Sequence, residues 1–320
     1  MTGKQSIRSE AKNHNSHFVY GPVPSRRLGL SLGINLVPPK TCTFNCIYCQ
    51  CGRTTNLTLN RQAYFSIKQI INQVRSVIKT QKVDYLTFSG EGEPTLNKNI
   101  GRIILLLKSE FRIPVAVLTN ASLLTDKSVR QALYHSDLVV PTLSAIHQRI
   151  FNRLHRPHPG LLIKNIIKGL KIFRRYYKGK IWIEVMLVKD VNDQPDHLAR
   201  LRQVIYELNP DRVHLNTVVR PPAEPSARPV AYDDLVQIQM LFGPGTEIAA
   251  FPLSKTQKHF SGVPEDAIIA VIHNRPVTDT DLVQALGIPP SLLRRTILKL
   301  IREGKITATS FQGKIFYRPV

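Results

Sequence analysis

The sequence predicts an α/β fold in which a parallel sheet is covered by helices. From about residue 30, short apolar stretches rich in β-branched residues alternate about six times with longer amphipathic stretches. Nearly continuous apolar strands that alternate with helices are typical of parallel sheets. Polar residues gather just after the predicted strands, where α/β folds place their active sites. Six strand–helix units allow either an open doubly wound sheet or a partly closed barrel.

Each element follows from its own pattern. In the first predicted helix, for example, the apolar residues from Ile67 to Ile78 recur at helical spacing on one side. Thr125 is the expected cap of the third helix. The predicted strands are 32–37, 84–90, 114–120, 137–143, 180–188 and 211–218, and the predicted helices are 66–79, 99–111, 124–135, 161–177 and 195–208.

The alternation ends at a proline-rich segment, residues 220–230, which we interpret as the edge of the core rather than a free linker. Further on, two helices joined by a turn at Gly287 precede two short strands around Gln312 and Gly313. This order predicts a winged helix-turn-helix. The expected organisation is a flexible basic tail (1–19), a core domain (20–255) and a winged-helix domain (262–320).

The composition is that of a soluble protein with an unusual charge. Lys and Arg outnumber Asp and Glu by 44 to 22, which gives a net charge of +22. Such an excess attracts polyanions and favours nucleic acid, an acidic membrane face or an acidic protein as partner. No stretch approaches the ~18 apolar residues that span a bilayer, so we expect a cytoplasmic protein without a membrane segment.

All four cysteines lie in PPKTCTFNCIYCQCGRT, residues 38–54. Such a tight group cannot staple distant parts of the chain, so a metal site is the better interpretation. Cys42, Cys46 and Cys49 have the spacing C-x3-C-x2-C, and three thiolates on one loop can converge on a single centre. Zinc, completed by Cys51, is one alternative. A 4Fe–4S cluster with one iron left open, or a purely redox cluster, is the other.

The cysteine spacing with Tyr48 before the third cysteine resembles the signature of the radical S-adenosylmethionine (radical SAM) enzymes. FSGEGEPTL, after the second strand, is similar to their Gly-Gly-Glu type motif, in which glycines allow close approach of the backbone. LTNASLL, LHRPHPG, EVMLVKDVND and LNTVVRPPAE extend the similarity to a poorly characterised subgroup with a C-terminal winged-helix module. The resemblance covers roughly residues 20–320 and implies a partial (β/α)6 barrel of radical SAM type.

The resemblance also implies roles for residues of this sequence. The implied cluster ligands are Cys42, Cys46 and Cys49, with Tyr48 lining the SAM pocket and Cys51 as a nearby free thiol. Gly90, Gly92 and Glu93 are implied to hold the methionine end of SAM, the Glu93 carboxylate accepting its ammonium group. Thr119, Asn120, Asn216 and Thr217 are implied as further contacts to SAM, and Glu184 and Asn192 as residues at or near the rim. No other catalytic residue is implied.

One motif departs from the resemblance. Relatives tend to carry Ser-Leu-Asp after the fourth strand, whereas this chain has Thr142, Leu143 and Ser144. A carboxylate contact to SAM or substrate is therefore missing at that position.

The implied cofactors are a 4Fe–4S cluster and SAM, cleaved to a 5'-deoxyadenosyl radical, with a reductant such as flavodoxin or ferredoxin. The substrate we expect is RNA, with tRNA foremost, because Arg26, Arg27, Lys40 and Arg53 flank the cluster motif and a basic stripe runs along one predicted helix. That stripe consists of Lys164, Lys168, Lys171, Arg175 and Lys178. The alternatives are a peptide- or protein-modifying enzyme of activase type and a redox-sensing winged-helix regulator.

Overall fold

A computed structural model describes residues 18–25, 27–249 and 265–320 of the chain. Most of the predicted tail, Arg26 and both predicted domain boundaries, at 255 and 262, lie outside the described residues. The assignment of residues 18 and 19 to the tail is wrong, because Phe18 and Val19 are buried in the core. Among the described helices, none is long and apolar enough to cross a membrane.

The centre of the molecule is an eight-stranded sheet. Its strands, in spatial order, are β1 (Val19–Ser25), β2 (Gly29–Ile34), β5 (Tyr85–Phe88), β6 (Val115–Thr119), β7 (Leu138–Pro141), β8 (Lys180–Leu187), β9 (Arg212–Thr217) and β10 (Thr246–Ile248). Strand β1 is antiparallel to β2, and every other neighbouring pair is parallel. The mostly parallel α/β sheet is thus confirmed.

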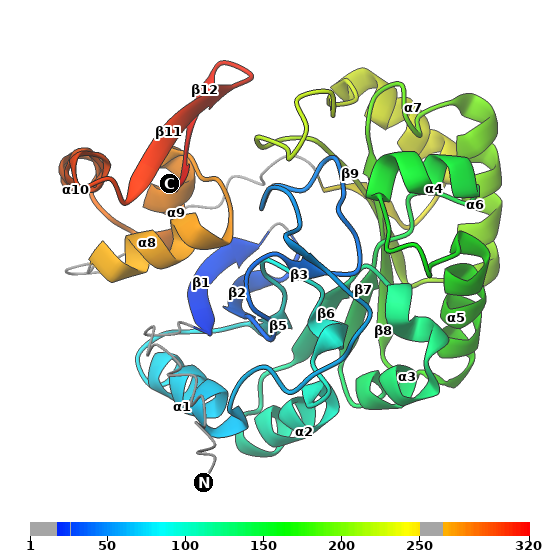
Figure 1. Ribbon diagram of the computed structural model, residues 1–320, viewed down its shortest axis with the longest axis horizontal. Coiled ribbons are helices and arrows are strands. Elements are labelled where there is room, and N and C mark those ends of the chain that lie inside the picture. The colour runs from blue at the N-terminus through cyan, green and yellow to red at the C-terminus, as the bar shows by residue number, and fades with distance from the viewer. Residues whose placement is uncertain (1–17, 26, 250–264) are drawn as a thin grey trace, which may run out of the picture.

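Helices surround this sheet on its outer side. They are α1 (Ile67–Ile78), α2 (Ile100–Glu110), α3 (Lys127–Leu133), α4 (Gln148–His155), α5 (Ile163–Tyr176), α6 (Pro195–Leu208) and α7 (Tyr232–Phe242), with 3-10 turns η1 (Pro94–Leu96) and η2 (Ser122–Thr125). Figure 1 shows them as an incomplete ring around the strands. Edge strands β1 and β10 are not paired with each other among the described residues, so the sheet is an open, partial barrel.

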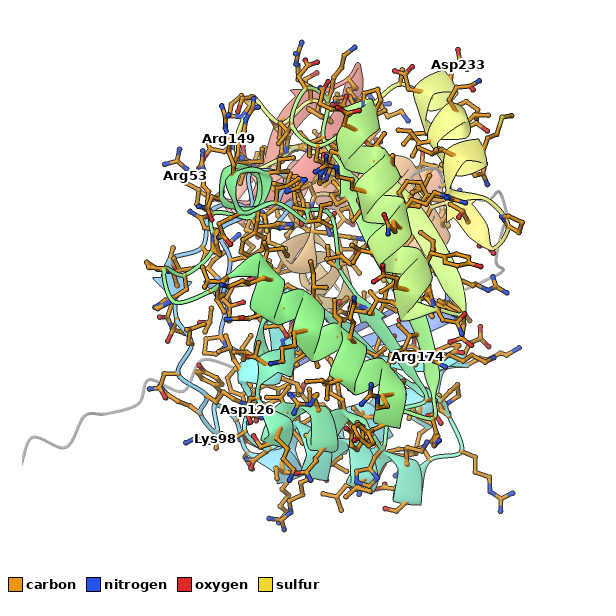
Figure 2. All side chains as sticks on the ribbon, turned by 90° about the vertical axis from the view of Figure 1, so that its right-hand side faces the viewer. Arg53, Lys98, Asp126, Arg149, Arg174 and Asp233 are labelled. Atoms are coloured by element: carbon orange, nitrogen blue, oxygen red, sulfur yellow. The ribbon has the colours of Figure 1, made fainter. Side chains whose placement is uncertain are left out.

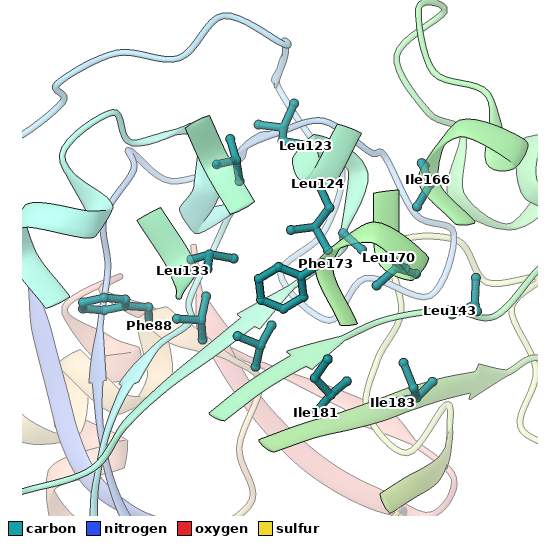
Figure 3. Close-up of a cluster of buried hydrophobic side chains, with 14 of the residues drawn as sticks. Phe88, Leu123, Leu124, Leu133, Leu143, Ile166, Leu170, Phe173, Ile181 and Ile183 are labelled. Atoms are coloured by element: carbon teal, nitrogen blue, oxygen red, sulfur yellow. The ribbon is translucent and has the colours of Figure 1, made fainter. Parts of the chain in front are cut away.

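The core lies between the sheet and the helices. Figure 3 shows Phe173 of α5 beside Leu133 of α3 and Leu124 of η2, all of them buried. The apolar face that the sequence predicts for α5 is the face that packs inward, with Ile166, Leu170 and Phe173 buried and the basic residues exposed. Burial of such a stripe supplies most of the stability of a surface helix.

Several elements differ from the prediction. Helix α3 begins after Asp126, whose side chain accepts a hydrogen bond of 2.7 Å from the N–H of Ser128, so Thr125 is not its cap. Strand β1 escapes prediction because two prolines and a glycine interrupt its sequence, VYGPVPS. Helix α4, helix α7 and strand β10 are also absent from the prediction. The segment 220–230 does belong to the core edge, since Ala227 and Val230 are buried.

Residues 265–320, here called the C-terminal elements, form α8 (Glu265–Asn274), α9 (Asp279–Leu286), α10 (Pro290–Arg302) and the hairpin β11 (Ile306–Phe311) and β12 (Lys314–Pro319). The turn at Gly287 and the hairpin turn at Gln312 and Gly313 lie where predicted, all with positive φ. Helix α8 was not predicted. The assignment as a winged-helix module stays a prediction.

The C-terminal elements lie beside β1, in the sector that the core helices leave open (Figure 1). Val23 of β1 packs into their apolar core, which includes Ile272 and Leu282. On the other side, Phe311 packs against an apolar cluster that includes Val218, just after β9. These elements therefore contact the barrel both at its first strand and at the end of β9.

Candidate active site

The cysteines lie on a loop, residues 38–57, that follows β2 and carries the short strands β3 (Thr41–Cys42) and β4 (Asn56–Leu57). One side of this cysteine loop is fixed to the SGEGEPT segment: the N–H of Lys40 donates to Glu91 O at 2.9 Å, and the N–H of Glu93 donates to Thr41 O at 3.1 Å. Lys40 adopts a φ of 60° at this contact.

The other side of the cysteine loop is fixed to the end of α4 and the loop that follows. Asn45 N–H donates to His155 O at 2.9 Å, and His158 N–H donates to Thr43 O at 2.9 Å. A third segment contributes Glu224, whose N–H donates to Ile47 O at 2.9 Å. The two sequence motifs LHRPHPG and RPPAE, both far along the chain, thus hold the same loop.

The four cysteine side chains are half-buried, and their sulfurs have different surroundings. Burial raises the pKa of Cys42 to about 12, and nearby Glu93 adds to this. Burial also raises the pKa of Cys46. In contrast, a hydrogen bond from Cys51 lowers the pKa of Cys49 to about 7. Cys51 therefore lies beside Cys49, and its sulfur is 4.0 Å from Gly90 O.

Two of the predicted ligands lie next to nitrogen atoms that can donate hydrogen bonds. Asn120 Nδ2 is 3.6 Å from Cys42 Sγ, and His155 Nδ1 is 3.3 Å from Cys46 Sγ. Among the residues that the structure describes, no three His, Cys, Asp or Glu side chains form a site for a single metal ion. In a 4Fe–4S cluster, each thiolate binds a different iron. The role of the three cysteines as ligands stays a prediction.

His155 was not predicted as a site residue, although it lies in LHRPHPG. It is 3% exposed, and burial lowers its pKa to about 3. Its Nδ1 is also 3.2 Å from the hydroxyl of Tyr48, and the two rings meet edge to face at 5.6 Å. Tyr48 therefore lies next to Cys46 with its hydroxyl directed at His155, and its place in a SAM pocket stays a prediction.

Glu93 is 2% exposed and its carboxylate is occupied by the protein. Oε1 accepts from Thr95 N at 3.1 Å, from Thr95 Oγ1 at 2.5 Å and from Thr119 Oγ1 at 2.7 Å, while Oε2 accepts from Asn120 N at 2.8 Å. The structure thus does not support the predicted contact between this carboxylate and the ammonium group of SAM. Glu93 instead joins the ends of β5 and β6 beneath the cysteine loop.

Gly90 and Gly92 are required by close packing. A Cβ on Gly92 would lie 2.1 Å from Thr41 O, and one on Gly90 would lie 1.6 Å from Asn35 Oδ1. Gly90 also has a φ of +133°, which side chains rarely adopt. The glycines bring the backbone of the motif against the cysteine loop, and their contact to SAM stays a prediction.

Thr119 and Thr217 are buried, and their hydroxyls are used within the protein. Thr119 Oγ1 accepts from Ala121 N at 3.1 Å in addition to donating to Glu93. Thr217 Oγ1 donates to Leu187 O at 2.9 Å and accepts from Val230 N at 2.9 Å. Side-chain contacts from either threonine to SAM are therefore not supported. Asn120 differs, because its side chain is half-buried and reaches the cysteine loop at Thr43 Oγ1, 2.7 Å away.

Glu184 and Asn216 come together inside the barrel. Asn216 Nδ2 donates to Glu184 Oε1 at 3.2 Å, and Arg27 NH1 donates to the same oxygen at 2.8 Å. Burial alone would raise the pKa of Glu184, but the Arg27 guanidinium and the Asn216 amide hold that pKa below its usual value.

Asn192 and Ser144 form a separate, fully buried group. Asn192 Nδ2 donates to Ser144 O at 2.9 Å and to Met186 O at 2.8 Å, and Asn192 Oδ1 accepts from Val188 N. The side chain therefore closes a loop and does not face the site. The hydroxyl of Ser144, where relatives tend to carry Asp, accepts from Met186 N at 2.8 Å.

The basic residues near the cysteines are partly neutralised. Arg53 and Arg156 both donate to Glu224 Oε1, at 2.9 and 2.7 Å. Arg27 is paired with Glu184, as described above. Arg53 is still 70% exposed and Arg156 43% exposed, so both guanidinium groups remain open to solvent beside the cysteine loop. Figure 2 shows Arg53 and Arg149 projecting from the surface.

The residues present fit an iron–sulfur cluster. Three thiols on one loop approach the same region, and Asn120 Nδ2 and His155 Nδ1, nitrogen atoms that can act as donors, lie next to two of the sulfurs. Such donors are the usual partners of thiolates that bind iron. A cluster held by the three cysteines of the C-x3-C-x2-C spacing would leave one iron for a fourth, non-cysteine ligand.

Comparison with known proteins agrees with this geometry. Residues 36–201, more than half of the chain, match the Radical SAM superfamily. A UPF0026 protein of Methanocaldococcus jannaschii is 34% identical over 94% of this chain and 95% of that protein. The dual-specificity RNA methyltransferase RlmN of Geotalea uraniireducens is 26% identical over 54% of this chain and 50% of that protein.

The fold also matches solved structures. A radical SAM methyltransferase from Sphaerobacter thermophilus superposes with a TM-score of 0.55 at 17% identity, over 68% of this chain and 65% of that chain. The two predicted cofactors, SAM and a 4Fe–4S cluster, are those of the matched superfamily. The chain therefore belongs to the UPF0026 family of radical SAM enzymes.

Proposed function

We propose that this enzyme binds a 4Fe–4S cluster through Cys42, Cys46 and Cys49 and uses it with SAM to modify RNA. When bound by these cysteines and reduced, the cluster would supply the electron for reductive cleavage of SAM, the source of the 5'-deoxyadenosyl radical in this class of chemistry. The observation that carries the proposal is the cysteine loop itself, which three separate motifs hold against the end of the parallel sheet.

The protein residues position and shield this chemistry. Gly90 and Gly92 bring the backbone of the SGEGEPT segment close to the cysteines, so that peptide groups and the half-buried Glu91 line the place for the methionine end of SAM. Tyr48 covers the loop from the side of α4. The apolar cluster around Met186 and Val218 excludes water from the same end of the barrel.

RNA is favoured as substrate class by charge and by one relative. The net charge of +22 attracts polyanions, and the RlmN relative is named as an RNA methyltransferase. Helix α5 presents Lys164, Lys168 and Arg175 to solvent. Figure 2 is turned so that this helix faces the viewer. The basic stripe starts six residues after His158, which contacts the cysteine loop. The phosphate backbone of an RNA bound along α5 would therefore lead toward the cysteines.

The cluster is tested by anaerobic reconstitution. We expect the absorption spectrum of an iron–sulfur cluster and about four irons per chain, a number set by the cluster type. Reduction in the presence of SAM should yield 5'-deoxyadenosine. Changing Cys42, Cys46 or Cys49 to Ala should remove the cluster, while Cys51→Ala should keep it. Wild-type protein that holds no iron would overturn the proposal, and so would a Cys51→Ala variant that loses the cluster as fully as the other three.

The substrate class is tested by retention of bulk tRNA and total RNA at increasing salt. We expect the logarithm of the binding constant to fall linearly with the logarithm of the salt concentration. We also expect RNA to crosslink to residues near α5. Absence of retention at low salt would exclude RNA. Formation of a modified protein or peptide in a SAM-dependent reaction would instead support the activase-type alternative.

A further inference from the structure

We infer that His155 donates a hydrogen bond to the thiolate of Cys46 and thereby raises the reduction potential of the cluster. This inference rests on the proposed function, since it requires Cys46 to bind iron. His155 does not bind the metal in this arrangement. It is a positioning residue that acts through the sulfur of Cys46.

The geometry selects the donor. Nδ1 of His155 faces two groups, Cys46 Sγ at 3.3 Å and the Tyr48 hydroxyl at 3.2 Å. An iron-bound thiolate has no proton and can only accept. A neutral imidazole carries its proton on one nitrogen, so the tautomer that satisfies this contact has the proton on Nδ1. The Tyr48 hydroxyl also lies within hydrogen-bonding reach of Cys46, so the same sulfur can accept twice.

The ring is held in this orientation by its neighbours. Phe44 and Phe151 lie against it with ring centroids at 5.1 and 5.4 Å, and Tyr48 meets it at 5.6 Å. The backbone carbonyl of His155 accepts from Asn45 N, one residue before Cys46. Backbone and side chain of one residue thus fix the loop and the sulfur together. His155 is 3% exposed, so its ring is shielded from bulk solvent.

The effect on the cluster follows from charge. One electron passes from a reductant, dithionite or a flavodoxin- or ferredoxin-type protein, to the cluster, and no proton moves. The sulfurs become more negative in the reduced form, so an N–H donor stabilises the reduced form more than the oxidised form. Hydrogen bonds to the sulfurs are one of the known determinants of cluster potential.

The test uses reconstituted protein without SAM and measures the midpoint potential by a redox titration monitored by electron paramagnetic resonance. His155→Phe retains the aromatic packing and lacks the donor, whereas His155→Asn places an N–H near the position of Nδ1. We expect His155→Phe to keep its iron and to reduce the equilibrium constant for one-electron reduction about tenfold, a shift of about 59 mV to more negative potential. His155→Asn should remain close to the wild type.

His158→Phe is the matched control: His158 lies three residues further on, its side chain accepts from Gly160 N, and the substitution retains its backbone contact to Thr43 O. It should leave the potential unchanged. If His155→Phe binds too little iron to titrate, wild-type iron content and potential in His155→Asn still support the inference. Equal potentials for His155→Phe and wild type would overturn it, as would loss of iron from both variants with a native circular dichroism spectrum. Absence of a cluster from the wild type would instead refute the proposed function.

Discussion

Arg220, two residues after the buried Val218, donates from NH2 to Asp281 Oδ1 at 3.3 Å and from Nε to Pro276 O at 2.9 Å. The Arg220 side chain is 10% exposed and connects the segment just after β9 to the C-terminal elements. Asp281 also accepts from the N–H of Thr278, the N-cap residue of α9, in a capping box, so the contact joins the core to the start of a helix. The C-terminal elements are therefore attached next to the active-site end of the barrel.

We expect Arg220→Met to loosen this attachment. Loss of a buried, charged hydrogen bond costs about 1.5–3 kcal/mol, so amide exchange in β1, which α8 and α9 contact, should accelerate about 10- to 150-fold. Hydrogen–deuterium exchange with mass spectrometry measures this. Arg212→Met, which removes the exposed pair with Glu247, is the control and should leave β1 unchanged. Unchanged exchange in Arg220→Met would mean that apolar packing alone holds the elements.

Gly92→Ala should damage the cysteine loop more than the fold. The added Cβ would lie 2.1 Å from Thr41 O and 2.7 Å from Val37 Cγ2, so the loop before Cys42 must shift. Overpacking of this kind costs about 1–3 kcal/mol, and we expect the variant to retain less than half of the wild-type iron. In Gly243→Ala the new Cβ has no neighbour within 4 Å, and iron content should be normal despite a positive φ. Full iron loading of Gly92→Ala would contradict the packing argument.

The Arg27–Glu184 pair should make stability depend on pH. Since the folded-state pKa of Glu184 lies below its ordinary value of 4.5, the pair stabilises the protein above that value and loses its effect as pH falls through the folded-state pKa. We expect Glu184→Gln to lower the free energy of unfolding at pH 7 by about 1 to 3 kcal/mol. This range lies between the effects of breaking an exposed and a buried ion pair. The loss of stability should shrink below pH 4.5. Urea midpoints from pH 3.5 to 7 measure it, and a pH-independent difference would count against the pair.

Charge reversal on α5 should weaken RNA binding. Each phosphate contact to a single strand contributes about 0.7 to the salt slope, so a triple change of Lys164, Lys168 and Arg175 to Glu should lower the slope by about 2. Filter binding of bulk tRNA across a salt series measures it. A second triple variant is the control: it changes Lys68, Lys79 and Lys82, exposed residues in and after α1, to Glu and alters the net charge equally. Equal losses in both variants would show that only net charge matters.

Local patterns made most of the barrel predictable. In the eight-stranded sheet, the strands from β2 to β9 are largely apolar, and α5 shows its buried and exposed faces directly in the sequence. Strand β1 could not be predicted in this way, because an edge strand that contains prolines cannot be told from a loop by its sequence. Nor could α4, since that helix has only two buried apolar residues, Phe151 and Leu154.

The cysteine loop could be identified from spacing, but the roles of its neighbours could not. Glu93 lies in a motif that suggests a ligand-binding carboxylate. Only the fold shows that both of its oxygens accept hydrogen bonds from Thr95, Thr119 and Asn120. His155 stands more than one hundred residues from Cys46, and a contact over that separation has no local signal. Its place in LHRPHPG was the available clue.

Val23 belongs to the apolar core of the C-terminal elements, which otherwise consists of residues from 268 to 317. A contact that closes so long a loop forms late, because chain entropy opposes it until the rest of the barrel is in place. We therefore expect β1, which is synthesised long before residue 265, to complete its packing late. Until then its outer apolar side chain is exposed, and a chain that stops before residue 265 keeps it exposed permanently, at an edge strand that is prone to aggregate.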